Sequence, residues 1–105
     1  MRTFPKSLAT FQKIVDERGE QLRGLTFEEL KQLASHPIEY LTVEARPATI
    51  GIIVQPLPSV GLRIVVQGFM EAELIPGKHV ALDGFYKYPD GTVAPMASEE
   101  FYEFD

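Results

Sequence analysis

The sequence predicts an α+β fold: two short N-terminal helices packed on one face of a curved antiparallel sheet of about five strands, arranged as a meander. Three observations lead to it. Apolar residues recur with helical spacing near the N-terminus, β-branched and aromatic residues dominate from Ile38 onward, and the predicted strands are joined by only a few residues. Such short connections cannot hold the crossover that parallel strands require. A half-apolar sheet also needs a covering layer, which the helices would supply.

The first helix is predicted over residues 7–18, and it can continue to Arg23. Its support is an apolar set with a spacing close to 3.6 residues: Leu8, Phe11, Ile14 and Val15. Gly19 and Gly24 are the candidate ends, because glycine accepts the left-handed conformation that closes a helix.

The second helix is predicted over residues 27–34. Thr26 and Glu29 have the spacing of a capping box, in which each residue satisfies a backbone N–H of the other. Pro37 should end this helical region, because the residue before a proline is disfavoured in the α conformation.

The remaining chain is predicted to form strands and turns. The strand segments are 39–46, 49–55, 62–69, 70–74, 80–88 and 92–94. The connections read RPA, PLPSVG, IPGKH and PDG, and the loop with Pro56 and Pro58 is predicted to be rigid, although it could also be a polyproline-type ligand. Gly68 and Gly84 are interpreted as points of sheet curvature, with a concave ligand surface as the alternative.

The segment YPDGT predicts a three-residue hairpin loop with glycine in the left-handed position. Strand alternation then puts Tyr86 and Tyr88 on one face and Phe85 and Lys87 on the other. If Phe85 joins the core, the two tyrosines form an outer ridge that can anchor a partner.

Length and composition limit the number of domains, the chemistry and the location that the protein can have. A chain of 105 residues suits one domain, divided into a helical layer (1–37), a sheet (38–97) and an acidic aromatic tail (98–105). The sequence has no cysteine, which excludes disulfides and thiolate chemistry. The longest apolar runs are too short for a membrane span, and no secretory signal is visible, so a cytoplasmic location is expected.

Charge is unevenly distributed along the chain. Residues 71–105 hold two basic and eight acidic side chains, within a total net charge of −5. Such a field repels phosphate backbones and favours basic partners. We therefore expect a protein partner or a second copy of the chain, and no nucleic acid or membrane.

The sequence contains no recognisable catalytic or metal-binding motif, and no cofactor is expected. His36 and His79 lack the spacing and the neighbouring carboxylates of a metal site. Asp83 lies in an otherwise apolar strand, so it could become a functional carboxylate if it faced inward. Asp83 and His79 are thus the candidate polar groups of a ligand pocket.

The tail, SEEFYEFD, combines acidic and aromatic residues. Phe101 and Phe104 are three positions apart, so a helical turn or an extended tail would bury them together, and docking on the chain's own core is expected. The alternative is a recognition segment for a basic groove on another protein.

These observations predict a small non-catalytic protein-interaction or regulatory module, which can bind a basic partner through its acidic C-terminal third. The candidate partner contacts are Tyr86, Lys87, Tyr88, Phe101 and Tyr102. The alternative is a small-molecule-binding protein or an enzyme with a pocket between the helices and the curved sheet, and a homodimer is left open.

Overall fold

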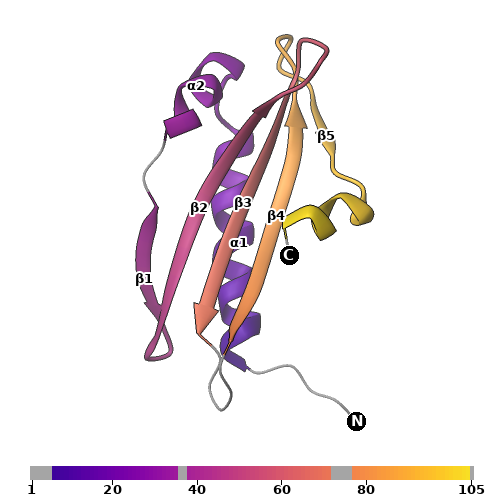
Figure 1. Ribbon diagram of the computed structural model, residues 1–105. Helices are drawn as coiled ribbons and strands as arrows, with labels where there is room; N and C mark the ends of the chain where they lie inside the picture. The colour runs from indigo at the N-terminus through magenta and orange to yellow at the C-terminus, as the bar shows by residue number, and fades with distance from the viewer. Residues whose placement is uncertain (1–5, 36–37, 72–76, 105) are drawn as a thin grey trace.

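The computed structural model describes residues 6–35, 38–71 and 77–104. Helix α1 (Lys6–Arg23) crosses one face of a five-stranded antiparallel sheet, and the C-terminal tail lies toward the other face (Figure 1). The predicted α+β meander, with its helices on one face, is confirmed.

Helix α1 spans the full predicted extent, from Lys6 to Arg23. It buries one stripe of residues against the sheet, including Phe11 and Val15, both fully buried. The prediction that Gly19 is a candidate end is wrong, because the helix continues through it. Gly24 does follow the last helical residue, but without the positive φ of a left-handed cap.

The second helical segment begins where the capping box predicts. The Thr26 backbone N–H donates to Glu29 Oε1 (3.0 Å), and the Glu29 N–H donates to Thr26 Oγ1 (3.1 Å). Helix α2 (Phe27–Lys31) continues as a 3-10 turn, η1 (Gln32–Ser35). Pro37 and His36 lie outside the described residues.

The sheet has the order β1-β2-β3-β4-β5, so each strand pairs with its neighbours in sequence. The strands are β1 (Glu39–Val43), β2 (Arg46–Pro56), β3 (Leu62–Glu71), β4 (Lys78–Lys87) and β5 (Val93–Pro95). The two segments predicted at 62–69 and 70–74 form one continuous strand as far as Glu71, and residues 72–74 lie outside the described residues.

The turn between β1 and β2 differs from the prediction. The RPA segment was expected to be the connection, whereas Arg46 and Pro47 belong to β2, with Pro47 opposite Thr42. The turn is made by Glu44 (φ 48°) and Ala45 (φ 68°). Two positive φ values are typical of the hairpin turns that match strand twist, and they usually belong to glycine or asparagine. This explains why the sequence did not indicate a turn here.

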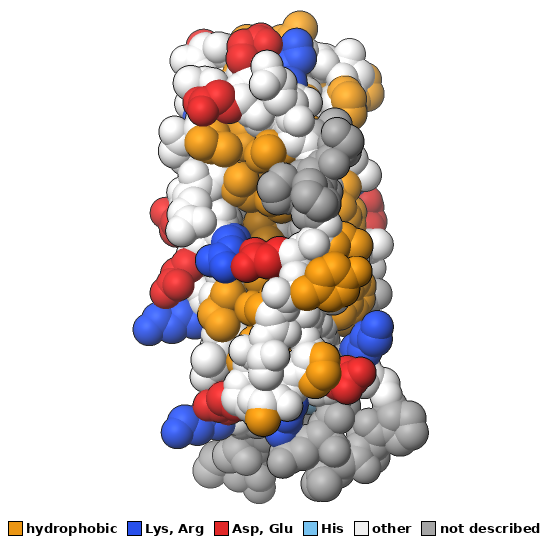
Figure 2. Space-filling view, turned by 90° about the vertical axis from the view of Figure 1, so that its left-hand side faces the viewer, with side chains coloured by type: hydrophobic (Ala, Val, Ile, Leu, Met, Phe, Trp, Pro, Cys, Tyr) orange, Lys and Arg blue, Asp and Glu red, His pale blue; other side chains and the backbone are white. Residues whose placement is uncertain are grey.

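The main core lies between the helices and the sheet. Its members at the centre of the sheet include Ile50, Ile64, Val66 and Phe85, and Phe27, Leu30 and Leu33 extend it at the α2 end. On the side of β1, hydrophobic side chains are visible from outside, on both sides of a pair of opposite charges (Figure 2). Some hydrophobic side chains on the β1 side of the molecule are therefore exposed at its surface.

Gly68 and Gly84 are positions of close approach. A Cβ at Gly68 would lie 2.6 Å from Cζ of Phe11 and 3.0 Å from Cγ2 of Val15. A Cβ at Gly84 would meet the side chain of Met96 on the opposite face. The pairing of β3 with β4 is continuous through both residues, without a bulge. These glycines let α1 and the tail pack directly on the sheet.

The hairpin after β4 matches its prediction. Gly91 has φ 91°, the Tyr88 N–H donates to Thr92 O (3.0 Å), and the Gly91 N–H donates to Tyr88 O (2.9 Å). Tyr86 pairs with Ala94, as expected.

Candidate functional site

The C-terminal tail covers part of the outer face of the sheet, the face opposite α1. The segment forms a 3-10 helix, η2 (Ser98–Phe104). It builds a second apolar cluster, whose members are Val65, Met96 and Phe104, with Ile53, Leu82, Tyr86 and Phe101 packed against them. The expectation that the tail docks on its own domain is confirmed.

A cluster of polar contacts, which we call the tail clamp, fixes this segment. The guanidinium of Arg63 on β3 lies 2.9 Å from Glu103 Oε2 and 3.4 Å from Glu100 Oε1. It also lies over the ring of Phe104, 5.1 Å from the centroid. The hydroxyl of Tyr86 donates to the same Glu100 oxygen. Because the Arg63 side chain is only 15% exposed, these contacts lie in a partly dry environment that strengthens them.

Replacement of Arg63 with alanine is expected to loosen the tail locally. Loss of both ion pairs and of the contact with Phe104 should speed amide hydrogen exchange of residues 98–104 by about tenfold, or roughly 1–2 kcal/mol of local opening energy. Glu103→Gln removes one exposed charge and is the matched control, with a smaller effect. Unchanged exchange in the tail, or an equal increase throughout β2 to β4, would contradict this prediction.

The tail clamp reduces the charge that the C-terminal third presents. Glu100 and Glu103 are engaged by Arg63, and Asp83 is engaged by Arg23. The exposed acids that remain in this third, within the described residues, include Asp90 and Glu99. A basic partner would therefore meet a weaker negative field than the sequence alone indicates.

The other candidate partner contacts are separated in space. Lys87 is only 6% exposed and donates from Nζ to the Arg23 carbonyl at the end of α1 (3.3 Å). Tyr88 packs against Gly61, where a Cβ would lie 2.9 Å from its ring. Tyr102 is 78% exposed on η2, whereas Tyr86 is half-buried beneath the tail. The tyrosines thus do not form one continuous exposed ridge.

Asp83 faces α1 and forms an ion pair with Arg23. Nη1 and Nη2 of Arg23 lie 2.7 Å and 3.2 Å from the two carboxylate oxygens, and Nη2 also donates to the Gly84 carbonyl (3.2 Å). The hydrogen bonds that Arg23 donates to Asp83 raise the pKa of the Arg23 guanidinium above its ordinary value. Asp83 therefore connects α1 to β4, and its carboxylate is occupied by this contact.

His79 occupies the same face of β4, four residues before Asp83, and is half-buried opposite Met70. Neither residue lines the pocket described next. The structure therefore does not bring the two candidate polar groups into this pocket.

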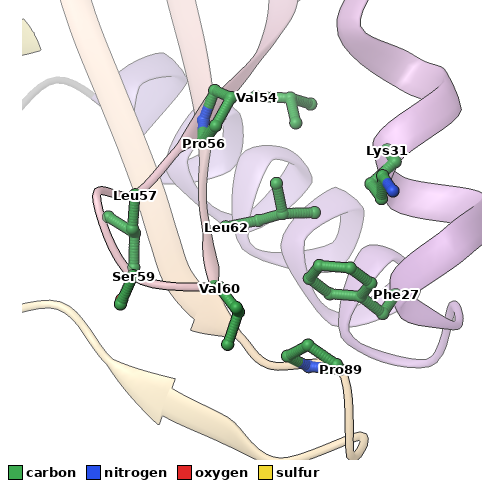
Figure 3. A pocket seen from close by; sticks show the side chains of 10 residues that line it. Phe27, Lys31, Val54, Pro56, Leu57, Ser59, Val60, Leu62 and Pro89 are labelled. Atoms are coloured by element: carbon green, nitrogen blue, oxygen red, sulfur yellow. The ribbon is translucent and has the colours of Figure 1, made fainter.

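At the end of the sheet near α2 lies a pocket of about 450 Å³, which we call the apical pocket. It is lined by Phe27, Lys31, Val54, Pro56, Leu57, Ser59, Val60, Gly61, Leu62 and Pro89. Phe27 approaches from α2, Val60 from the β2–β3 loop, and Pro89 from the β4–β5 turn (Figure 3). Three segments distant in sequence thus meet around one apolar space.

The walls of the apical pocket are held by local structure. The capping box fixes the start of α2, which carries Phe27. In the β2–β3 loop the Leu57 N–H donates to Gly61 O (3.0 Å), and Pro56 and Pro58 restrict φ. Two prolines and one backbone hydrogen bond thus restrict the conformations of this loop.

The lining of the apical pocket is mainly apolar. Its polar side chains are Lys31 and Ser59, and the ammonium group of Lys31 lies over the ring of Phe27, 5.6 Å from the centroid. Among the described residues, no group of three or more His, Asp or Glu side chains could hold a metal ion. Among the residues that line the pocket there is no carboxylate or histidine, and Lys31 is its ionisable side chain.

Sequence reasoning did not identify the apical pocket. The sequence predicts a rigid proline-containing loop, but the proximity of this loop to Phe27 and Pro89 depends on the tertiary fold. The available signal was a set of apolar residues in loops, namely Leu57, Val60 and Pro89. Val60 in particular is 75% exposed, which is unusual for valine.

Comparison of the chain with protein-family models, with curated proteins and with solved structures finds no match. Over the described parts of the chain, no helix has both the length and the apolar character needed to cross a bilayer.

Proposed function

We propose that this protein is a non-catalytic protein-interaction module that receives an apolar side chain of its partner in the apical pocket. The observation that carries the proposal is a largely apolar pocket that three distant segments build, with Lys31 as its ionisable lining residue. Apolar anchors inserted into such pockets supply much of the binding energy in protein complexes.

The exposure of Val60 favours a protein partner over a small ligand. A volume of about 450 Å³ would suit a small molecule, but such ligands usually have most of their surface enclosed. Val60 forms one wall and is 75% exposed, so a small ligand would remain open to water on that side. The surface of a protein partner would cover Val60 and close the site.

Charge near the pocket favours a basic residue beside the apolar anchor. Lys31 and Glu28 lie 3.8 Å apart and largely offset one another. Asp90 follows the pocket residue Pro89 and is exposed. Hydrogen bonds from Thr92 hold the pKa of Asp90 below its ordinary value, so this carboxylate stays charged at neutral pH. The expected partner segment therefore pairs a large apolar side chain with a neighbouring lysine or arginine.

Peptide display followed by calorimetry tests this proposal. Selection on the intact protein should enrich peptides with one large apolar residue next to a basic residue, and Val60→Asp should weaken their binding at least tenfold. The reason is that a carboxylate in the apolar wall would lose hydration when the anchor enters. Val60→Ile keeps the apolar wall and should retain binding.

Tyr102→Asp is the control for a charge added elsewhere, because Tyr102 is exposed on η2 and should leave binding unchanged. Peptides that bind Val60→Asp as tightly as the wild type would refute the apical pocket as the contact site. Enrichment of no peptide, together with saturable binding of a small apolar probe in the pocket, would instead support the ligand-binding alternative.

A further inference from the structure

Two exposed hydrophobic side chains lie at the edge of the sheet formed by β1. Tyr40 is 79% exposed and Ile38 is 55% exposed. Both point away from α1, in register with Thr49 and Gly51 of β2. In the view onto this side, hydrophobic side chains cluster where the outer face of the sheet begins (Figure 2). Contiguous exposed apolar surface beside a strand edge indicates a docking surface.

At the opposite edge of the sheet, formed by β4, side chains of α1 cover backbone carbonyl groups that could otherwise pair with another strand. Gln12 of α1 donates from Nε2 to the Leu82 carbonyl (2.9 Å), and Arg23 donates to the Gly84 carbonyl (3.2 Å). The end of β4 is further covered by β5. Within the described residues, no side chain makes a comparable hydrogen bond to the backbone of residues 40–43 in β1. Side chains of α1 thus occupy part of one edge, whereas residues 40–43 at the other edge have no such cover among the described residues.

Electrostatics favour a second copy of the same chain at this edge. Arg18 and Glu39 neutralise each other in a bidentate pair, with distances of 3.0 Å and 2.8 Å. Glu44 and Arg46 add one charge of each sign nearby. The tail lies next to β4 and β5, away from β1 (Figure 1). Two copies that meet at β1 therefore keep their negative regions far apart, which limits repulsion despite a net charge of −5 each.

We propose that the protein forms a symmetric dimer in which the β1 strands of two copies pair antiparallel, with Leu41 on the two-fold axis. This register pairs the whole of β1, Glu39–Val43, and joins the two sheets into one. It places Glu39 opposite Val43 of the second copy, so the two Glu39 side chains stay well separated. Each Tyr40 lies opposite Thr42 of the second copy.

The outer face offers a hollow for that tyrosine. A pocket of about 260 Å³ is lined by residues that include Thr42, Pro47, Thr49 and Phe69, and Tyr40 of the same copy forms part of its wall. Thr42 pairs directly with Pro47, so Tyr40 of the second copy would lean over Thr42 towards this hollow. By symmetry the same patch donates one tyrosine and receives another, which is the requirement for a two-fold interface.

Cysteine crosslinking tests the register, because the chain contains no cysteine of its own. Leu41→Cys places two thiols directly opposite one another, within reach of a disulfide, and should give a covalent dimer under mild oxidation. Val93→Cys, on β5, is the matched control and should remain monomeric under the same conditions. Crosslinking of Val93→Cys without crosslinking of Leu41→Cys would overturn the proposal.

Sedimentation equilibrium measures the dissociation constant of the proposed dimer. The wild type should sediment at twice the monomer mass, and Tyr40→Lys should raise the dimer dissociation constant at least tenfold while circular dichroism stays unchanged. Tyr102→Lys makes the same substitution at a similarly exposed tyrosine on η2 and should have no effect. A wild type that remains monomeric at millimolar concentration would refute the dimer.

The dimer is independent of the proposed function. Val60→Asp should leave the dissociation constant of the dimer unchanged, and Tyr40→Lys should leave peptide binding at the apical pocket unchanged. Failure of one proposal is therefore distinguishable from failure of the other.

Discussion

Replacement of Phe11 with alanine is expected to lower the free energy of unfolding by about 3–5 kcal/mol. Phe11 is fully buried in α1 and is among the largest completely enclosed side chains. Its ring rests against Gly68, and β3 has no Cβ there to fill the space that the ring would leave. Urea denaturation followed by circular dichroism should show a lower midpoint with an unchanged slope.

A substitution at Gly68 tests whether the close approach of Phe11 to this glycine contributes to stability. Gly68→Ala should destabilise by about 1–3 kcal/mol, because the added methyl group must displace the ring of Phe11 or the side chain of Val15. Phe11→Leu shortens the side chain that the methyl group meets, so the double variant should lose less stability than the sum of the single losses. Strict additivity would show that the two positions do not interact.

The second large effect is expected at the contact between α1 and β4. Asp83→Ala should cost about 2–3 kcal/mol, because Arg23 loses its buried carboxylate partner, at 25% and 18% exposure of the two side chains, and keeps only the exposed Glu20 at 3.4 Å. Thermal and urea unfolding measure this loss. Asp90→Ala removes an exposed carboxylate of the same type and should have a much smaller effect.

A substitution at Gly19 tests the same contact between α1 and β4 more specifically. In an ordinary helix interior, Gly→Ala stabilises by about 1 kcal/mol. A Cβ at Gly19 would instead collide with the carboxylate of Asp83, so Gly19→Ala should destabilise the wild type by about 2 kcal/mol. In the Asp83→Ala background the same change should become neutral or stabilising. Stabilisation by Gly19→Ala in the wild type would contradict the proposed contact.

The elements that were predicted well depend on local rules. The Thr26–Glu29 capping box and the hairpin at Gly91 each combine a short motif with one backbone requirement, and both lie where the sequence indicates. The meander also followed from short connections alone. The capping box and the hairpin needed only residues within four positions of one another, whereas the meander depended on connections of three to six residues.

The elements that were missed depend on contacts between distant segments. Gly19 looks like a helix end in isolation, and only the position of Asp83 on β4 explains a glycine inside α1. Glu44 and Ala45 adopt positive φ because the pairing of β1 with β2 leaves two residues for the turn. The apical pocket is likewise invisible locally, because its walls come from three segments. The sequence left open what covers the predicted tyrosine ridge, and in the structure the tail packs over Tyr86.

The side chains of Gln12 and Arg23 over β4 limit the size that assemblies of this protein can reach. Open-ended stacking of sheets, as in fibres, needs two free edges on every molecule, one to receive the previous copy and one to receive the next. Here α1 occupies the backbone carbonyls of Leu82 and Gly84 at one of those edges. Growth by strand addition through β1 would consequently stop after a single step, and concentrated solutions should remain clear rather than form filaments.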